Sequence, residues 1–144
     1  MKRLCAKIEI SYTCPCLRPM FPFGHFELTQ IVKNMCAQIQ AYCPNFNPKI
    51  NLVLCDDNLS EELNNRWLAT PGPTNTLAFA GEPPKIQHQL FFSLNTWRRE
   101  CVLYDQNPKD YARRLLAHGL AHLAGFDHSP AMDEICDSLQ LDAE

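Results

Sequence analysis

The sequence of 144 residues contains no apolar run close to the ~18 residues that a membrane-spanning helix requires, which excludes a membrane span. Its first residues reach Glu9 before an apolar run forms, so no signal-peptide core is present and we expect a cytoplasmic protein. Glycine is scarce, at 5 residues, which excludes a collagen-like fibre. Charged residues make up only 20% and the net charge is −3, so no global basic excess indicates a nucleic-acid partner.

Hydrophobic residues make up 46% of the chain, which is typical of a globular protein and not of a disordered segment or a coiled coil. The length is that of one domain, so we expect residues 1–144 to form a single unit. Strands and helices intermix without strict alternation, which predicts an α+β fold: a compact domain with a mixed β-sheet packed with helices. Hydrophobic periodicity, together with proline and glycine positions, predicts strands over 2–11, 50–55, 76–80 and 88–93, and helices over 26–43, 60–68, 95–104, 108–124 and 130–141.

Eight cysteines are present, and in a cytoplasmic protein we expect them to stay reduced. Four lie among apolar neighbours and are predicted to act as small core residues: Cys5, Cys36, Cys55 and Cys101. Cys14 and Cys16, separated by one proline, could ligate a metal ion or be redox-active. One C-x-C pair cannot close a tetrahedral site, however, so we favour two thiols in a loop.

Three of the five histidines fall within residues 118–128, and this cluster is the feature that most needs explanation. His118 and His122 are four residues apart on a predicted helix, so both imidazoles lie on one face and can reach a single metal ion. Gly125 ends that helix and can adopt the left-handed conformation that turns the chain back. His128 can then return as a third ligand, which places the metal site on a central helix and the turn that follows it.

A metal ion also gives the two helical histidines a partner. The helix around them is apolar nearly all round and is therefore predicted to be buried. Burying a polar group without a partner costs ~1–3 kcal/mol. Three neutral nitrogen ligands suit Zn²⁺ with an open fourth position, as in catalytic sites, although nickel, copper or iron can bind the same imidazoles. Zinc lowers the pKa of its bound water to ~7 and polarises carbonyl or phosphoryl oxygens, so the pattern predicts metal-assisted hydrolysis.

The spacing H-x₃-H-x₂-G-x₂-H is also that of the metzincin proteases, which carry a glutamate general base directly after the first histidine. Here that position is Gly119, which cannot accept a proton. Peptide hydrolysis by that route is therefore disfavoured, and no other side chain is identifiable from the sequence as a general base.

Residues 118–128, HGLAHLAGFDH, resemble the H-G-x-x-H-L-x-G-Y-D-H motif of the YbeY family, bacterial rRNA maturation factors described as single-strand endoribonucleases. The strand over 52–57 is similar to a family strand that ends in acidic residues. The segments over 63–67 and 73–79 resemble L-N-x-x-[YF]-R and P-T-D-V-L-S-F. The resemblance covers about residues 50–142, whereas the first 45 residues match only in their order of a strand and a helix.

The resemblance implies a compact α+β domain with one Zn²⁺ held by His118, His122 and His128. It implies endonuclease chemistry through water on that metal, in 16S rRNA 3′-end maturation, ribosome assembly and ribosome quality control. The implied partners are rRNA and the small ribosomal subunit, with the ribosome-assembly GTPase Era as a further candidate. Neither DNA nor a membrane is expected as a partner.

The sequence departs from the family pattern at several positions. Leu68 stands where the family has an arginine, so a bidentate phosphate partner is lost, and Arg66 offers only a partial replacement. Asn75 stands where the family has an aspartate; the resemblance places Thr74 and Asn75 in the cleft near the metal. These departures keep open a second interpretation, a non-catalytic ribosome-assembly factor with a structural zinc. A metalloprotease is a third and weaker one.

A few further residues have interpretations that the sequence leaves open. Asp127 could orient a ligand histidine or simply hold the glycine turn, and we favour the turn. The doubled arginines at 98–99 and 113–114 could form a basic rim for RNA, although such pairs are more often solvated helix faces. Trp67 and Trp97 are predicted to pack rather than to stack on bases.

Overall fold

The computed structural model of the chain describes residues 5–68, 72–84, 86–126 and 130–142. The elements within these residues are four strands, five α-helices and one short 3₁₀-helix. The strands are β1 (Lys7–Tyr12), β2 (Lys49–Cys55), β3 (Thr76–Phe79) and β4 (His88–Ser93). The helices are η1 (Pro15–Met20), α1 (His25–Tyr42), α2 (Asp57–Leu68), α3 (Leu94–Leu103), α4 (Pro108–Leu123) and α5 (Pro130–Asp142).

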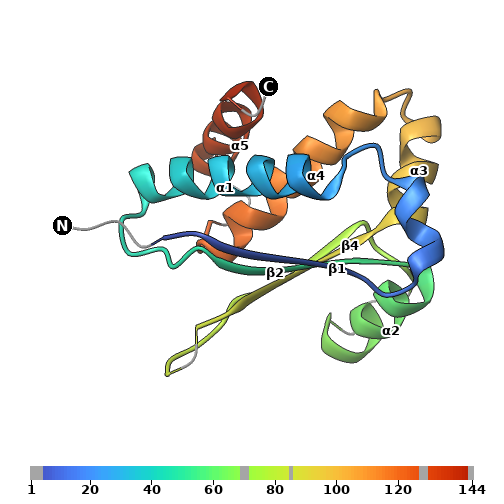
Figure 1. Cartoon of the computed structure of the whole chain (residues 1–144), viewed down its shortest axis with the longest axis horizontal. Helices are drawn as coiled ribbons and strands as arrows, with labels where there is room; N and C mark the ends of the chain where they lie inside the picture. Colours follow the sequence, from blue (N-terminus) through green and yellow to red (C-terminus); the bar gives the residue numbers. More distant parts are fainter. Residues whose placement is uncertain (1–4, 69–71, 85, 127–129, 143–144) are drawn as a thin grey trace.

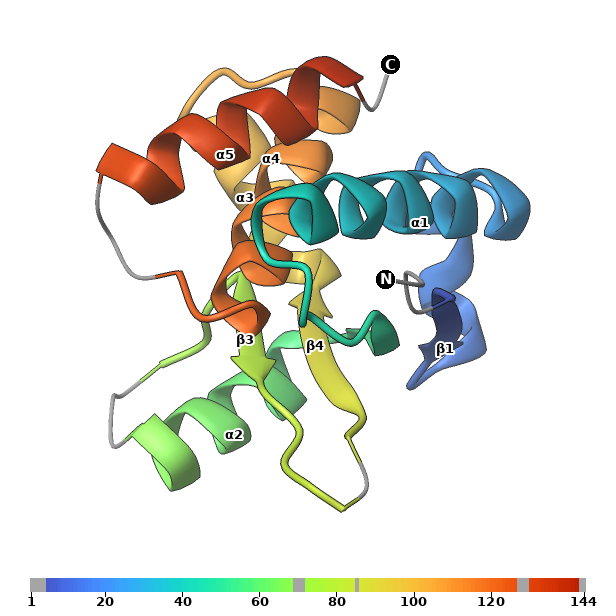
Figure 2. The same ribbon diagram turned by 90° about the vertical axis from the view of Figure 1, so that its left-hand side faces the viewer.

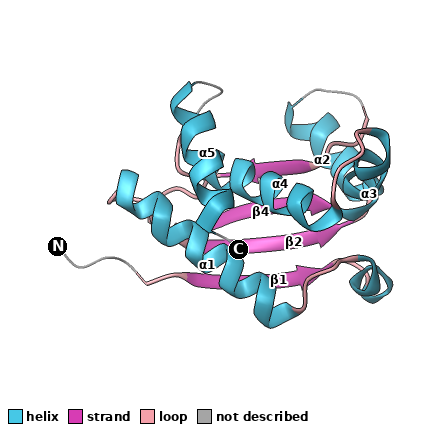
Figure 3. Cartoon of the chain, turned by 90° about the horizontal axis from the view of Figure 1, so that it is seen from above, coloured by secondary structure: helices cyan, strands magenta, loops and turns pink. Residues whose placement is uncertain are grey.

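The four strands form one mixed sheet in the order β1-β2-β4-β3, as Figure 3 shows from above. β1, β2 and β4 run parallel, and β3 pairs antiparallel with β4 at the edge of the sheet. The parallel strands are joined through helices, as parallel pairing requires, while β3 and β4 are linked by a hairpin connection. The predicted α+β fold with a mixed sheet is confirmed.

The helices are divided unequally between the two faces of the sheet. α1 and α4 pack over one face, α5 packs on both of them, and α2 lies on the opposite face against β3 and β4 (Figures 1 and 2). The side chains of β2 and β4 that point toward α1 and α4 lie in the core of the protein. They are essentially inaccessible to solvent: Ile50, Leu52, Leu54, Leu90 and Phe92. The alternate positions Glu9 and Gln89 are exposed, as the period of two along a strand requires.

The described helices contain none that is both long enough and apolar enough to cross a membrane. Helix α4 is the most buried of them, since nine of its sixteen residues are buried. Its start is set by Asn107, whose side-chain oxygen accepts hydrogen bonds from the backbone N–H groups of Lys109 (3.0 Å) and Asp110 (3.1 Å). Pro108 follows at the first helical position, where a missing N–H costs nothing.

Four details differ from the sequence-based expectations. The first strand was expected over 2–11, but β1 covers Lys7–Tyr12, and the described residues 5 and 6 precede it. α2 begins at Asp57 instead of residue 60, because the Asp56 side chain accepts a hydrogen bond from the Leu59 N–H at 3.0 Å and so caps the start of the helix. The proline-rich stretch after β1 contains η1. Cys5 is exposed because it precedes β1, whereas Cys36, Cys55 and Cys101 are buried as predicted.

Asp57 joins the starts of α2 and α3. Its carboxylate accepts hydrogen bonds from the Ser93 hydroxyl at 2.9 Å, the Thr96 hydroxyl at 2.6 Å and the Arg99 guanidinium at 2.6 Å. Partial burial acts to raise the pKa of Asp57, but these three donors and the charge of Arg99 outweigh it and lower the pKa. Arg99 is therefore committed to an ion pair within the fold.

Helix α4 lies close against the sheet at Gly119. A Cβ atom at this position would lie 2.5 Å from Cδ1 of Leu90 on β4, well inside van der Waals contact. The missing side chain therefore lets the helix backbone lie directly on the leucine. A glutamate at the position after His118 would have to place its side chain in this contact with the buried Leu90.

We expect Gly119→Ala to lower the free energy of unfolding by about 1 kcal/mol. Alanine is favoured over glycine in a helix by about 1 kcal/mol, but overpacking against a core side chain costs about 1–3 kcal/mol. In a Leu90→Ala background the same substitution should be neutral or stabilising, because the clashing methyl groups are gone. Urea unfolding followed by circular dichroism on the four proteins measures this coupling; additive effects would contradict it.

Candidate metal centre

His118 and His122 lie one turn apart near the end of α4, and the structure brings their imidazoles together. Their Nε2 atoms are 3.1 Å apart, and the rings meet edge to face with centroids 4.6 Å apart and planes at 82°. Both residues are partly buried, so the pair is open to solvent on one side. The sequence-based prediction that the i, i+4 spacing places both rings on one face is confirmed.

The donor set fits a metal ion such as zinc. Two nitrogens that bind one tetrahedral Zn²⁺ at 2.0–2.1 Å are ~3.3 Å apart, close to the separation seen here. His122 lies in the last turn of α4, where the aligned peptide dipoles give the helix end a partial negative charge that favours a cation. These two residues could therefore hold an ion without any rearrangement of the helix.

A glycine turn follows the two histidines directly. Gly125 has a φ of +96°, in the left-handed region that glycine adopts without strain. Its N–H donates to the His122 carbonyl at 3.0 Å, and the Phe126 N–H donates to the Ala121 carbonyl at 3.1 Å, the paired bonds of a Schellman motif. The predicted left-handed turn that ends the helix at Gly125 is confirmed.

The predicted third ligand, His128, lies outside the described residues, as does Asp127. Within the part of the chain that the structure describes, no group of three histidine, cysteine or carboxylate side chains is arranged as a metal site. The complete ligand set thus stays a prediction, while its first two members and the turn after them have the geometry that the prediction requires.

A polar network lies on the same face of α4 as the histidines. Tyr111 is seven residues before His118, which places the two side chains on one face about 10 Å apart along the axis. The Tyr111 hydroxyl donates to a Glu100 carboxylate oxygen at 3.0 Å, and the Asn75 side-chain N–H donates to the same oxygen at 3.0 Å. Burial, and then the bond to Glu100, raises the pKa of Tyr111 to about 12, so the hydroxyl remains a donor.

This network was not found from the sequence, which marked only Asn75. The signal that could have found it is the spacing of seven residues between Tyr111 and His118, which places both on one face of a helix. The network also gives a physical reason for asparagine at position 75. An aspartate there would face the Glu100 carboxylate without a proton to donate, whereas the asparagine amide donates one.

The region of the expected arginine is exposed. Leu68 ends α2 and is 55% exposed, and Arg66 and Trp67 beside it are also exposed. Trp67 does pack edge-on against Phe79, with ring centroids 6.4 Å apart, yet it keeps 63% of its surface in solvent. Trp97 is buried, as predicted.

The doubled arginines contribute less free positive charge than a basic rim needs. Arg99 is paired with Asp57, and Arg113 lies 3.4 Å from a carboxylate oxygen of Asp110 and 5.3 Å from the ring centre of Phe23. Arg98, Arg99 and Arg114 are exposed, and Arg113 is half-buried. The favoured interpretation as solvated helix faces therefore holds for the first pair and for Arg114, although Arg99 also pairs with Asp57.

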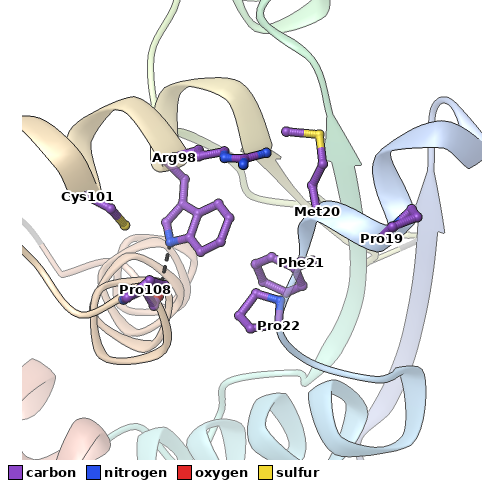
Figure 4. A pocket seen from close by; sticks show the side chains of 8 residues that line it. Pro19, Met20, Phe21, Pro22, Arg98, Cys101 and Pro108 are labelled. Atoms are coloured by element: carbon purple, nitrogen blue, oxygen red, sulfur yellow. Dashed lines mark hydrogen bonds between the residues drawn. The ribbon is translucent and has the colours of Figure 1, made fainter.

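A separate pocket of about 370 Å³ lies at the other end of α4, between η1 and α3 (Figure 4). Met20 and Arg98 border it, and the Trp97 indole N–H in its wall donates to the Pro108 carbonyl at 3.2 Å, the dashed bond in the figure. Pro108 is the first residue of α4 and His118 is ten residues further on, about 15 Å along the helix. This pocket is therefore distinct from the histidine pair.

Comparison with known proteins points to one family. The model of the family described as Endoribonuclease YbeY matches residues 21–137. The chain is 38% identical to Endoribonuclease YbeY of Oleidesulfovibrio alaskensis over 114 residues, covering 62% of this chain and 68% of that protein. It is 31% identical to Endoribonuclease YbeY of Lawsonia intracellularis over 122 residues, covering 83% and 86%.

The fold is similar to that of a solved structure. The solution structure of TM1509 from Thermotoga maritima superposes with a TM-score of 0.64, covering 95% of this chain and 89% of that one. The sequence identity is 17%, so this likeness speaks for the fold alone.

We expect Asn75→Asp to destabilise the protein by about 1–3 kcal/mol, because it removes a donor to Glu100 and sets two carboxylates side by side. Glu100→Gln in the same chain should restore part of the loss, since the glutamine amide can donate in the reverse direction. Denaturant unfolding near neutral pH measures both. Asn65→Asp, on the exposed face of α2, is the matched control for the charge change. Equal losses at the two positions would contradict the role of the network.

Proposed function

The chain belongs to the YbeY family, and on that premise we propose that it is a zinc-dependent single-strand endoribonuclease acting in 16S rRNA 3′-end maturation and ribosome quality control. The observation that carries this proposal is the pair of imidazole nitrogens 3.1 Å apart at the end of α4. The relatives' name, Endoribonuclease YbeY, supports RNA as the substrate class.

We assign the metal to His118, His122 and His128. When bound, zinc supplies a Lewis acid for a phosphoryl oxygen and lowers the pKa of a water molecule. The protein's own contribution is positional: α4 holds the first two imidazoles on one face, and the left-handed turn at Gly125 ends the helix directly after them. Gly119 cannot serve as a general base, and it is packed against Leu90 rather than facing the histidines.

Attraction to RNA must be local, because the chain carries a net charge of −3 and two of its arginines are engaged internally. We propose that single-stranded RNA approaches past the exposed end of α2, where Arg66 supplies charge and Trp67 an aromatic surface. Leu68, in the place of the family arginine, leaves this approach without a bidentate phosphate contact.

The finer parts of the proposal follow from the family resemblance. We propose that residues 1–144 act as one unit, in the cytoplasm, on rRNA of the small ribosomal subunit, with the assembly GTPase Era as a possible further partner. The exposed Leu68 favours one alternative: an assembly factor that binds the subunit and keeps zinc only as a structural ion. Metal-dependent cleavage of RNA separates the two.

We expect His118→Ala and His122→Ala each to lower zinc affinity by more than ~100-fold, because each removes a direct ligand. Loss of a residue that only supports a ligand already costs ~10–100-fold. Both should also abolish cleavage of a single-stranded 16S rRNA fragment. Zinc content by elemental analysis, zinc titration and the cleavage assay on the same samples give the result. His25→Ala, at the exposed start of α1, is the control.

The two measurements have separate meanings. Zinc binding unchanged in both variants would refute the metal site. If the variants lose zinc binding but the wild type shows no chelator-sensitive cleavage, the metal site is supported. The nuclease is then refuted in favour of the assembly factor.

We expect Leu68→Arg to raise the rate of RNA cleavage and to strengthen RNA binding, with a steeper dependence on salt, because it adds a guanidinium that can grip a phosphate. Val102→Arg is the matched control: it adds the same charge at another exposed apolar residue, near the end of α3. Rates and dissociation constants across a salt series measure the effect. An equal gain in both variants would show that charge alone, and not position 68, is limiting.

A further inference from the structure

Cys14 and Cys16 form a pair of neighbouring thiols outside the histidine site. Cys14 follows the end of β1, and Cys16 is the second residue of η1. Their sulfur atoms are in direct contact at 2.6 Å. Cys16 is exposed and Cys14 partly so, and therefore small molecules in solution can reach the pair.

The backbone on both sides of the pair is fixed. The Thr13 N–H donates to the Leu54 carbonyl at 3.0 Å, which ties the chain before the pair to β2. The Leu17 N–H donates to the Cys14 carbonyl at 3.0 Å, closing a turn around both cysteines, and the Leu17 side chain is buried. Pro15 between them has a fixed φ. The two sulfurs are thus held together by the fold and not only by their nearness in sequence.

The two thiols have unequal acidities. The hydrogen bond from the Cys16 thiol lowers the pKa of Cys14, and the same contact raises the pKa of Cys16. Cys14 therefore has the larger thiolate fraction and Cys16 holds its proton more firmly. A low-pKa, accessible thiol beside a second thiol is the arrangement of a nucleophilic cysteine with a resolving partner.

The buried cysteines differ in each of these respects. Burial raises the pKa of Cys36 and Cys55 to about 12 and that of Cys136 to about 11, and Cys101 is also raised by burial. Such thiols are inert at neutral pH. Among the described residues, no second pair of cysteine sulfurs is in contact, and exposed Cys5 has no thiol beside it.

We propose that Cys14 and Cys16 are a redox-modifiable dithiol that closes to an intramolecular disulfide by exchange with a small disulfide of the glutathione type. This modification site is independent of the proposed nuclease function. It changes the interpretation of the C-x-C pair from two loop thiols to a reactive couple.

The exchange proceeds in two balanced steps. The Cys14 thiolate attacks one sulfur of oxidised glutathione, the S–S bond of glutathione breaks, and one glutathione thiolate leaves and takes up a proton. Cys16 then gives its proton to solvent and attacks the Cys14 sulfur of the mixed disulfide; the bond from Cys14 to glutathione breaks, and the second glutathione leaves as a thiolate that takes up a proton. The protein dithiol is oxidised by two electrons, and one glutathione disulfide is reduced to two thiols.

The test is mass spectrometry of the reduced full-length chain after exposure to oxidised glutathione without oxygen near neutral pH, followed by an acid quench and peptide mapping. We expect a species that has lost two hydrogens, retains no glutathione, and carries its disulfide between Cys14 and Cys16. Cys16→Ser should trap one glutathione on Cys14, because the resolving thiol is gone while the serine hydroxyl still donates. Cys14→Ser should react several-fold more slowly at Cys16.

Exposed Cys5 gives the internal comparison. Cys5→Ser should leave the disulfide and its rate unchanged. Stable glutathione adducts on both Cys14 and Cys16 of the wild type, or a reaction no faster than that of Cys5, would overturn the proposal. Circular dichroism of each variant confirms that it is folded, and because the readout is mass, the result does not depend on RNA cleavage.

Discussion

The close approach of α4 to the sheet at Gly119 is the packing constraint on which the candidate site depends. A side chain there would meet Leu90, so a larger residue would have to displace the leucine side chain or the helix. α4 carries the Tyr111 contact near its start and the histidine pair near its end. Because one rigid helix carries both, its depth on the sheet sets the position of the imidazoles relative to β3 and the start of α3.

Two carboxylates, Asp57 and Glu100, tie elements of the fold together. Asp57 gathers donors from β4 and α3 at the start of α2, and Glu100 gathers donors from the start of β3 and from α4. Arg99 belongs to the first of these networks. A count of basic residues therefore overstates the positive charge that is not already paired with a carboxylate.

Sequence patterns predicted most helices and strands to within a few residues because their signals are local. Asn107 and Pro108 mark the start of α4, and Gly125 marks its end, through hydrogen bonds that involve only near neighbours. The start of α2 was missed for a related reason: aspartates break a strand and also cap a helix, and only the bond from Leu59 to Asp56 decides between the two. Cys5 was wrongly assigned to the core, since an apolar neighbourhood in sequence does not show where the first strand begins.

The sequence by itself determined that His118 and His122 share one helix face and that the chain turns after them, because the helical period and the left-handed preference of glycine are properties of the local chain. It also excluded a glutamate base at Gly119. Only the tertiary structure showed that this glycine packs against Leu90, that Asn75 and Tyr111 both donate to Glu100, and that Arg99 pairs with Asp57. Asn75 and Glu100 are 25 residues apart along the chain, and Asp57 and Arg99 are 42 residues apart. Such contacts are set by how the elements pack, and no local pattern encodes them.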